Sequence, residues 1–409
     1  MINGRHERVA VSITPLALEA DSRAFKVAVS LRRFGYRSLV LEGAASAHDF
    51  SQFGLEVISL GKPSRRAGGS ASKKGFLDPS RNFGFWGSLA RLSVFYVGFF
   101  FRYFFVPFRY LPRAELYYVH SYEYLAVVLA RRRRARIIYD AHDFYQEMVP
   151  KQNQSYFVRA FLLPAMARIE RWTARRCDAV VTVSAGVAAA LAETISVNAT
   201  VIRNAVDSRN NRDAHASIRE VLKLEPSDLL LVMIGNRKVG IDFDFVAAIL
   251  RRLPSSFHFV FIGRGFELGN GVSHGIGADR RLHFLPAVPA SEVSRFIASA
   301  DAGLLLRRPI SRNDHSALPN GFFHIIDAGL PLARLPLPEI EAVIGDRAVG
   351  PVLDAGDSER AARQILSFFD DSQTRARCAE EVAKLARNLD WSAQEPILRA
   401  VCEPNRSHH

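Results

Sequence analysis

Short apolar runs recur along the first half of the chain, and amphipathic segments with helical spacing separate them. The runs predict strands at Val9–Thr14, Ser38–Leu41, Leu55–Leu60, Leu116–Val119, Arg136–Tyr139 and Ala179–Val183. The segments between them predict helices at Ser22–Phe34, Leu125–Arg133, Phe157–Arg175 and Ala185–Glu193. Strands that alternate with helices predict right-handed βαβ units and a parallel sheet buried on both faces.

A second series of the same kind follows the polar stretch Asp207–Asp213, which suits an interdomain linker. Its predicted strands are Leu229–Ile234, Phe257–Ile262, Leu282–Leu285 and Ala302–Leu306. Its predicted helices are Phe243–Leu253, Ser291–Ser299, Phe322–Ala328 and Ser358–Phe369. Two successive open sheets predict an α/β protein with two Rossmann-like domains facing a cleft, where ligands bind at the carboxyl ends of the strands.

Length and composition agree with this organisation. The 409 residues exceed what one hydrophobic core holds and fit two domains of roughly 200 residues each. The apolar fraction of 48% excludes a mainly disordered chain. Cys177, Cys378 and Cys402 show no metal or redox spacing, which predicts a reducing compartment. The first residues pass straight into a strand, so we expect no secretion signal.

The net charge of +13 allows three kinds of partner: nucleic acid, an anionic membrane or phosphorylated small molecules. No helix-turn-helix, zinc-finger, RRM or KH signature is present, so we expect no nucleic-acid partner. The 29 Phe favour a membrane, because a large share of them lies in one short segment.

That segment is Trp86–Leu111, WGSLARLSVFYVGFFFRYFFVPFRYL. Arg91, Arg102 and Arg109 interrupt it and Pro107 would bend it, which makes a spanning helix costly. At 100° per residue these arginines fall within about 20° of one line, a narrow cationic stripe on an aromatic helix. The pattern predicts a helix lying in an anionic bilayer interface. The alternative is a helix packed on the protein with its arginines in water.

Several segments, in order, carry a resemblance to a known family. They are Asp21–Leu41, VHSYEYL at Val119–Leu125, IIYDAHD at Ile137–Asp143, CDAVVTVSAGVAAAL, VIRNAVD, ADAGLLL and LPNGFFHIIDAGLPLARLPLPEI at Leu318–Ile340. Together they resemble family-4-like retaining glycosyltransferases of the GT-B fold, of the type that builds bacterial exopolysaccharide, capsule or lipopolysaccharide.

The resemblance implies a division of the chain. It gives an acceptor-binding domain at 1–206, a nucleotide-sugar-binding domain at 207–385, and a C-terminal helix within 386–409 that crosses back to the first domain. It also implies a UDP or GDP type of donor, and no cofactor or metal ion.

In the donor half, Arg237 and Lys238 follow a predicted strand, and the resemblance puts phosphate-binding basic residues in this loop. Gly263 and Gly265 follow the next strand and permit a tight turn close to a nucleobase. Their charges make Arg237 and Lys238 our candidates to stabilise the leaving diphosphate.

The Pro-Asn pair that opens the next donor-site helix brings backbone N–H groups of Asn320 and Gly321 to a helix N-terminus, a place for a sugar or its phosphate. By the resemblance, Gly321 stands where the family has Lys. Ser316 and His324 stand where it has two Glu, eight residues apart. An imidazole can still hydrogen-bond a ribose hydroxyl.

In the acceptor half, the resemblance matches His120 to a histidine beside the transferred sugar and Asp143 to an acidic acceptor contact. It implies no protein nucleophile, and we assign no general base. Both residues also have a simpler interpretation as strand-end groups bonded to neighbouring backbone.

Three functions remain open at this point. The leading one is a bacterial glycosyltransferase, cytoplasmic and peripheral at the inner face of the cell membrane, that moves a sugar onto a lipid-linked or polysaccharide acceptor. A second is a glucuronosyltransferase type, in which Arg307, Arg308 or Arg312 would bind the donor carboxylate. A third is a non-catalytic, glycosyltransferase-like subunit, favoured by the missing Lys and Glu.

Overall fold

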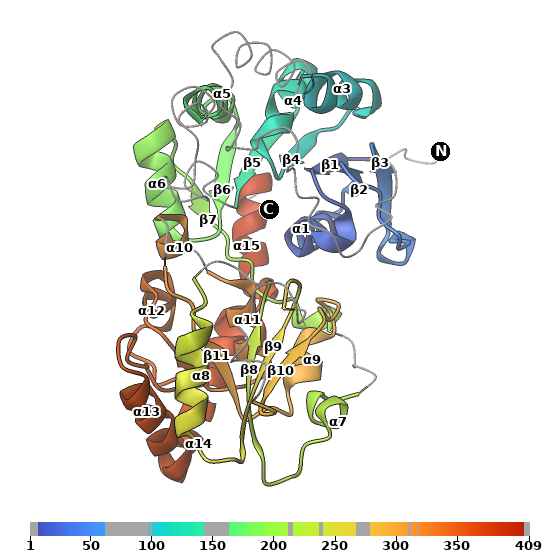
Figure 1. Ribbon diagram of the computed structural model, residues 1–409. Coiled ribbons are helices and arrows are strands. Elements are labelled where there is room, and N and C mark those ends of the chain that lie inside the picture. Colours follow the sequence, from blue (N-terminus) through green and yellow to red (C-terminus); the bar gives the residue numbers. More distant parts are fainter. Residues whose placement is uncertain are drawn as a thin grey trace, which may run out of the picture. The chain divides into compact units, whose positions relative to one another are not determined.

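The computed structural model describes residues 7–61, 98, 100–142, 163–211, 216–236, 240–266, 279–309, 312–316 and 318–404 (Figure 1). The chain forms two compact units. Unit 1 comprises Met1–Ile202 with Glu395–His409, and unit 2 comprises Arg203–Gln394.

Unit 1 contains a parallel sheet of seven strands in the order β3-β2-β1-β4-β5-β6-β7. Its strands are β1 (Val9–Thr14), β2 (Arg37–Glu42), β3 (Leu55–Ser59), β4 (Leu116–Val119), β5 (Arg136–Ala141), β6 (Ala179–Thr182) and β7 (Thr200–Val201). The chain runs outward from β1 to β3 and then returns to the other side of β1. The strand order therefore reverses between β1 and β4, where Ile13 pairs with Val119. Ligands of open α/β sheets bind at such a reversal, outside the carboxyl ends of the strands.

Helices of unit 1 follow its strands, as the alternating pattern predicted. They are α1 (Ser22–Arg33), α3 (Val106–Tyr110), α4 (Leu125–Arg131), α5 (Leu163–Ala174) and α6 (Ala185–Ile195), with short 3-10 turns at Leu18–Ala20, Ser51–Phe53 and Tyr122–Tyr124. Helix α1 begins at Asp21, whose side chain accepts a hydrogen bond from the Ala24 amide, and it ends before Gly35 in a left-handed conformation.

Helix α15 (Trp391–Cys402) starts in unit 2, and its larger part belongs to unit 1. Within unit 1, Arg136 Nε donates to the Val401 carbonyl at 2.9 Å, and Ser30 Oγ donates to Glu395 at 2.8 Å. Arg8 forms an ion pair of 2.6 Å with Glu403 just beyond the helix. These contacts attach the end of the chain to the first unit.

Unit 2 contains a parallel sheet of five strands in the order β10-β9-β8-β11-β12. Its strands are β8 (Leu229–Ile234), β9 (Phe257–Ile262), β10 (Leu282–Leu285), β11 (Ala302–Leu305) and β12 (Leu332–Arg334). The order reverses between β8 and β11, so unit 2 has its own switch point.

Two apolar cores lie on the two faces of this sheet. Helices of unit 2 are α7 (Ile218–Leu222), α8 (Phe243–Arg252), α9 (Val293–Ile297), α10 (Arg312–Ser316), α11 (Asn320–Asp327), α12 (Pro338–Ile344), α13 (Ser358–Asp370) and α14 (Ser372–Asn388), with a 3-10 turn at Ser208–Asn210. Val246 of α8 and Ile365 of α13 pack with Phe259 on one face. Phe322 of α11 and Val382 of α14 pack with Val232 on the other. The prediction of sheets buried on both faces is confirmed here.

Observed elements depart from the sequence prediction in two places that bear on function. Strand β5 extends to Ala141, so Asp140 lies within the strand rather than after it. In the predicted membrane segment, Phe101–Phe105 forms a π-helical turn that continues into α3. Among the described residues, no helix combines the length and the apolar character needed to cross a bilayer. Residues 62–97, which include Arg91 and the first part of that segment, lie outside the described ranges.

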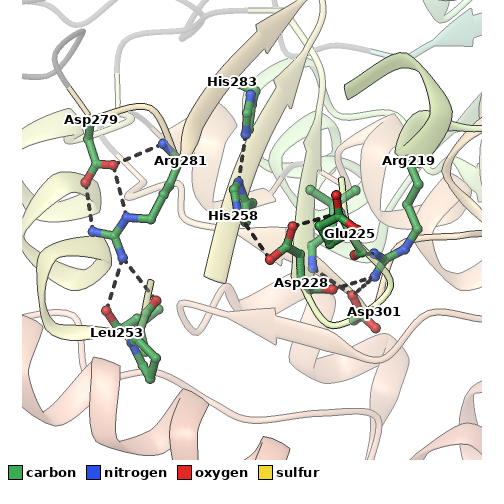
Figure 2. A network of polar contacts seen from close by, with 11 residues as sticks. Arg219, Glu225, Asp228, Leu253, His258, Asp279, Arg281, His283 and Asp301 are labelled. Carbon is green, nitrogen blue, oxygen red and sulfur yellow. Dashed lines mark hydrogen bonds and ion pairs between the residues drawn. The ribbon is translucent and has the colours of Figure 1, made fainter. Parts of the chain in front are cut away.

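Polar side chains join the amino ends of the unit 2 strands (Figure 2). His258 Nδ1 of β9 lies 3.0 Å from His283 Nε2 of β10, and His258 Nε2 lies 3.8 Å from Asp228, which precedes β8. Arg219 of α7 pairs with Asp301 before β11. Burial is the main cause that lowers the pKa of both histidines, and the charge of His258 lowers the pKa of His283 further.

These two histidines predict a loss of stability in mild acid. Their pKa values are lower in the folded than in the unfolded chain, so the unfolded chain binds more protons once the pH falls below about 6.5. We expect the free energy of unfolding to fall from pH 7.5 to pH 5.5. The fall should be smaller in a His258→Gln/His283→Gln variant, measured by urea denaturation at both pH values. His48→Gln, which changes an exposed histidine of unit 1, is the control. An unchanged pH dependence in the double variant would contradict the assignment.

Candidate functional site

Polar side chains gather at the switch point of unit 1. His120 follows β4 directly, and its backbone N–H donates to the Ile13 carbonyl of β1 at 2.9 Å. Its ring is fully buried. The backbone bond between the two strands therefore fixes where the histidine sits.

The Asp140 carboxylate lies next to the His120 ring. Asp140 Oδ2 accepts a hydrogen bond of 2.7 Å from Arg23 Nε, and both side chains are buried. Arg23 Nη1 also donates to the Ile202 carbonyl at 2.8 Å. Burial alone would raise the pKa of Asp140, but the charge of Arg23 and the contact with His120 outweigh it, so the pKa lies well below its usual range. Asp140 is therefore ionised.

His120 Nδ1 lies 3.4 Å from Asp140 Oδ2, an ion-pair distance without the alignment of a full hydrogen bond. Within the described residues, His120 Nε2 and Asp140 Oδ1 are buried and make no hydrogen bond. The His142 ring lies 6.3 Å from the His120 ring, centroid to centroid. This leaves one imidazole nitrogen beside a carboxylate and the other buried without a hydrogen-bond partner among the described residues.

Asp21 completes the charge around the two histidines. Its side chain accepts hydrogen bonds from Thr14 Oγ1 at 2.7 Å and from the Ala24 amide at 3.0 Å. Burial raises its pKa, but the nearby histidine charges and these hydrogen bonds lower it more. Unit 1 thus holds two carboxylates and one guanidinium at its switch point.

His120, Asp140 and His142 each offer a ligand atom, and these atoms lie within 4.8 Å of one another. Two imidazoles and a carboxylate are a donor set that suits Zn²⁺ and related ions. Arg23, however, already neutralises Asp140 and binds the oxygen nearest His120. The charge balance therefore favours an imidazole that faces its carboxylate directly over a bound divalent cation.

Of the two residues predicted in the acceptor half, the structure places His120 beside Asp140. Asp143 lies outside the described residues. Sequence reasoning missed Asp140, Arg23 and Asp21. The signal was present, because a charge in the middle of the apolar strand Arg136–Ala141 needs a buried partner.

At the carboxyl edge of the unit 2 sheet, the loops after β8 and β9 lie in close contact. Gly263, at φ +150°, approaches so closely that a Cβ would lie 2.1 Å from the Gly235 carbonyl oxygen. The Arg264 amide donates to Asn236 Oδ1 at 3.2 Å. The loops after β8 and β9 therefore pack backbone against backbone. Gly263 and the adjoining Gly265, at φ +85°, form the tight turn that the sequence predicted.

Helix α11 begins at the same edge. A Cβ on Gly321 would lie 2.3 Å from the carbonyl oxygen of Ile234, the last residue of β8. Asn320 Oδ1 accepts a hydrogen bond of 3.0 Å from Asn204 Nδ2. No side chain caps the helix at Pro319. The Phe322 amide donates to the Pro319 carbonyl at 3.0 Å. The amides of Asn320 and Gly321 consequently remain for water or a ligand to bind.

Two further predicted donor residues lie in helices α10 and α11 of unit 2. His324 is half-buried, with Nδ1 3.2 Å from Ser294 Oγ of α9. Ser316 is buried at the end of α10. Arg237 and Lys238 lie outside the described residues.

Two arginines of the glucuronosyltransferase hypothesis have partners within unit 2. Arg307 forms an ion pair with Asp314. Arg308 donates to the Ala355 carbonyl at 2.7 Å and lies 3.5 Å from Asp242. Binding a sugar carboxylate would require them to give up these contacts.

Residues 47–210 match the model of Glycosyltransferase Family 4. This match spans most of the described strands and helices of unit 1, from β3 to β7. Among curated proteins, no sequence matches the chain.

Solved structures cover nearly the whole chain. Sucrose-phosphate synthase from Thermosynechococcus elongatus has a TM-score of 0.64 at 12% identity, over 96% of this chain and 97% of that one. HepE from Anabaena in complex with UDP has a TM-score of 0.65 at 14% identity, over 97% and 100%. WaaG, a glycosyltransferase involved in lipopolysaccharide biosynthesis, has a TM-score of 0.63 at 14% identity, over 96% and 99%. At these identities the similarity shows the fold.

The comparisons confirm the predicted fold. The fold is GT-B, with two α/β units that each contain a parallel sheet. The match of residues 47–210 to Glycosyltransferase Family 4 agrees with the predicted glycosyltransferase class.

The close approach at the unit 2 edge predicts that Gly263→Ala is destabilising. The new Cβ would meet the Gly235 carbonyl, so the two loops must separate. We expect the free energy of unfolding to fall by about 1–3 kcal/mol in urea denaturation. Gly356→Ala is the control, because its nearest neighbour lies at an ordinary 3.6 Å. Equal effects of the two changes would show that the loops are not in contact.

Proposed function

We propose that the protein transfers a sugar, with retention, from a nucleotide diphosphate sugar to a lipid-linked or polysaccharide acceptor in bacterial cell-surface glycan synthesis. The observation that carries the donor half is the uncapped start of α11, held against the end of β8 by Gly321. Backbone amides and a helix dipole at that point favour an anionic group.

Two structural neighbours support the finer assignments. HepE is described in complex with UDP, with UDP and glucose, and with UDP-glucose. This favours a uridine donor, within the UDP or GDP type expected from the sequence. WaaG is described as acting in lipopolysaccharide biosynthesis. This favours a cell-surface acceptor for the present protein.

The proposed reaction breaks the bond between the sugar C1 and the diphosphate oxygen and forms a bond between C1 and the acceptor oxygen. The acceptor proton passes to the departing phosphate oxygen on the same face of the sugar, which retains the configuration. The protein contributes charge for the leaving diphosphate, for which Arg237 and Lys238 remain our candidates. His120 and Asp143 are proposed to contact the transferred sugar and the acceptor.

An exposed aromatic surface of unit 1 supports a lipid-linked acceptor. Large apolar side chains of one short segment are exposed by between 39% and 57%, namely Phe100, Phe101, Phe105, Phe108 and Tyr110. Arg102 and Arg109 are exposed among them. Because the turn at Phe101–Phe105 is π-helical, the step of about 100° per residue does not hold across it. The exposed aromatic rings, more than a line of arginines, therefore support interfacial binding.

The donor proposal predicts binding of a free nucleoside diphosphate. We expect UDP or GDP at about 100 times its Kd to stabilise the protein by about 2.7 kcal/mol, seen as a raised melting temperature. Arg237→Ala/Lys238→Ala should abolish this rise. Arg360→Ala/Arg363→Ala removes the same charge from exposed positions of α13 and should preserve it. A wild-type protein that responds to neither nucleotide would leave the non-catalytic subunit as the better description.

A second prediction concerns His324. If its imidazole bonds the donor, His324→Ala should weaken binding of UDP-glucose by about 1–3 kcal/mol in calorimetry. Ser294→Ala removes one internal partner of His324 and should leave affinity nearly unchanged. Equal affinities in wild type and His324→Ala would make this histidine structural. For His324→Glu we predict no direction.

A third prediction is that the protein binds anionic vesicles without spanning them. Co-sedimentation should require anionic lipid, weaken with salt, and fall when Phe100, Phe101 and Phe105 are changed to Ser. Phe104→Ser is a comparison within the same turn, because Phe104 packs partly against the unit 1 core. A carbonate wash should release the protein from bacterial membranes. Retention after the wash would indicate a spanning anchor, and binding indifferent to lipid charge and to the Phe changes would contradict the interfacial role.

A further inference from the structure

The buried ion pair between Arg23 and Asp140 has no evident purpose as a stabilising contact. Removing a guanidinium and a carboxylate from water costs several kcal/mol, which their attraction only offsets when further hydrogen bonds complete the pair. Asp140 Oδ1 and Arg23 Nη2 make no hydrogen bond within the described residues. Apolar side chains could fill this space at least as well, so the pair points to a role beyond stability.

Its third member is His120. Arg23 Nε and His120 Nδ1 converge on the same oxygen, Asp140 Oδ2, at 2.7 and 3.4 Å. An ionised carboxylate can only accept hydrogen bonds, so a proton on the nitrogen that faces it is the favourable arrangement. Nδ1 is then the N–H, and Nε2 holds the lone pair.

The guanidinium fixes the position of the carboxylate. Arg23 lies in the first turn of α1 and donates both to Asp140 and to the Ile202 carbonyl at the end of unit 1's first segment. Asp140 itself lies within strand β5. A hydrogen bond to the Ile13 carbonyl of β1 fixes the backbone of His120. All three groups are thus set by the sheet and its first helix.

We propose that Arg23 and Asp140 are positioning residues, which hold His120 in the Nδ1–H tautomer and leave Nε2 as the nitrogen that can accept a hydrogen bond. The tautomer rests on the contact of 3.4 Å between Nδ1 and the ionised Asp140. That Nε2 accepts a hydrogen bond from a sugar hydroxyl rests on the proposed function. The same logic orients histidines in other enzymes, where a buried aspartate selects the imidazole tautomer.

The test uses the full-length protein with ¹⁵N-labelled histidine and two-bond ¹H–¹⁵N correlation, and needs no substrate. His120→Gln identifies the signals of this ring. We expect Nδ1 to bear the proton in the wild type, and Asp140→Asn to shift the ring toward the Nε2–H form. Arg23→Lys keeps a cation beside Asp140 and should keep the wild-type tautomer.

Glu170→Gln is a matched control, because it also neutralises a buried carboxylate of unit 1, one that bonds Tyr139 of the same strand. It should leave the His120 signals unchanged. An Nε2–H ring in the wild type, or a folded Asp140→Asn variant with an unchanged tautomer, would overturn the proposal.

Turnover of UDP-glucose separates this proposal from the proposed function. If both hold, Asp140→Asn should lower kcat by about tenfold or more with KM nearly unchanged, and Glu170→Gln should not. If the wild-type protein turns over UDP-glucose, and Asp140→Asn changes the tautomer without lowering kcat, the ligand role of Nε2 is overturned. A tautomer change in a protein with no turnover at all would count against the proposed function while supporting the positioning of His120.

Discussion

The close approach of backbone to the end of β8 is the constraint on which unit 2 depends. Gly263 and Gly321 lie where a Cβ would come within 2.1 and 2.3 Å of carbonyl oxygens at or just after that strand. Only glycine permits both contacts, and they bring a loop and the start of α11 to one point. Because the switch point between β8 and β11 lies there too, fold and site share the same few peptide units. An anion bound there would meet backbone amides that need no side-chain ordering.

In unit 1, buried side chains rather than backbone occupy the switch point. Its switch point lies between β1 and β4, and His120, Asp140 and Arg23 meet beside it. Such a cluster is costly to bury, and each member is tied to the sheet or to its first helix. In the proposed reaction, a preorganised imidazole would suit a site that orients a sugar without a protein nucleophile. In the second unit, the residues that could have bound a donor carboxylate are engaged otherwise, since Arg307 pairs with Asp314.

The sequence predicted the fold well because the strands are continuous apolar runs. The predicted strands match the observed bounds at Leu229–Ile234 and Phe257–Ile262. A parallel strand buried on both faces is apolar along nearly its whole length, so its ends are easy to recognise. Helix α14 was missed because it buries little apolar surface: Cys378, Val382 and Leu385 are its buried residues. The predicted alignment of Arg102 and Arg109 on one helix face holds only for a regular α-helix. The π-helical turn at Phe101–Phe105 breaks that regularity.

The candidate site was less accessible to sequence reasoning. A motif indicates which residues stand near a strand end, but the partner of a buried charge is set by tertiary packing. Arg23 and Asp140 are 117 positions apart, and no local pattern joins them. Gly263 and Gly321 could be recognised as turn or helix-start residues, but only the packing shows that both approach the end of β8.

The central claim is that the carboxyl edge of the unit 2 sheet binds the nucleotide. Hydrogen–deuterium exchange with and without UDP tests it most directly, because the amides of Gly263–Gly265 and of Asn320–Phe323 report on the two elements that meet there. The account predicts slower exchange in both segments when UDP is bound, with the amino-end network around His258 and His283 unchanged. Protection that appears elsewhere, with these two segments unaffected, would contradict it.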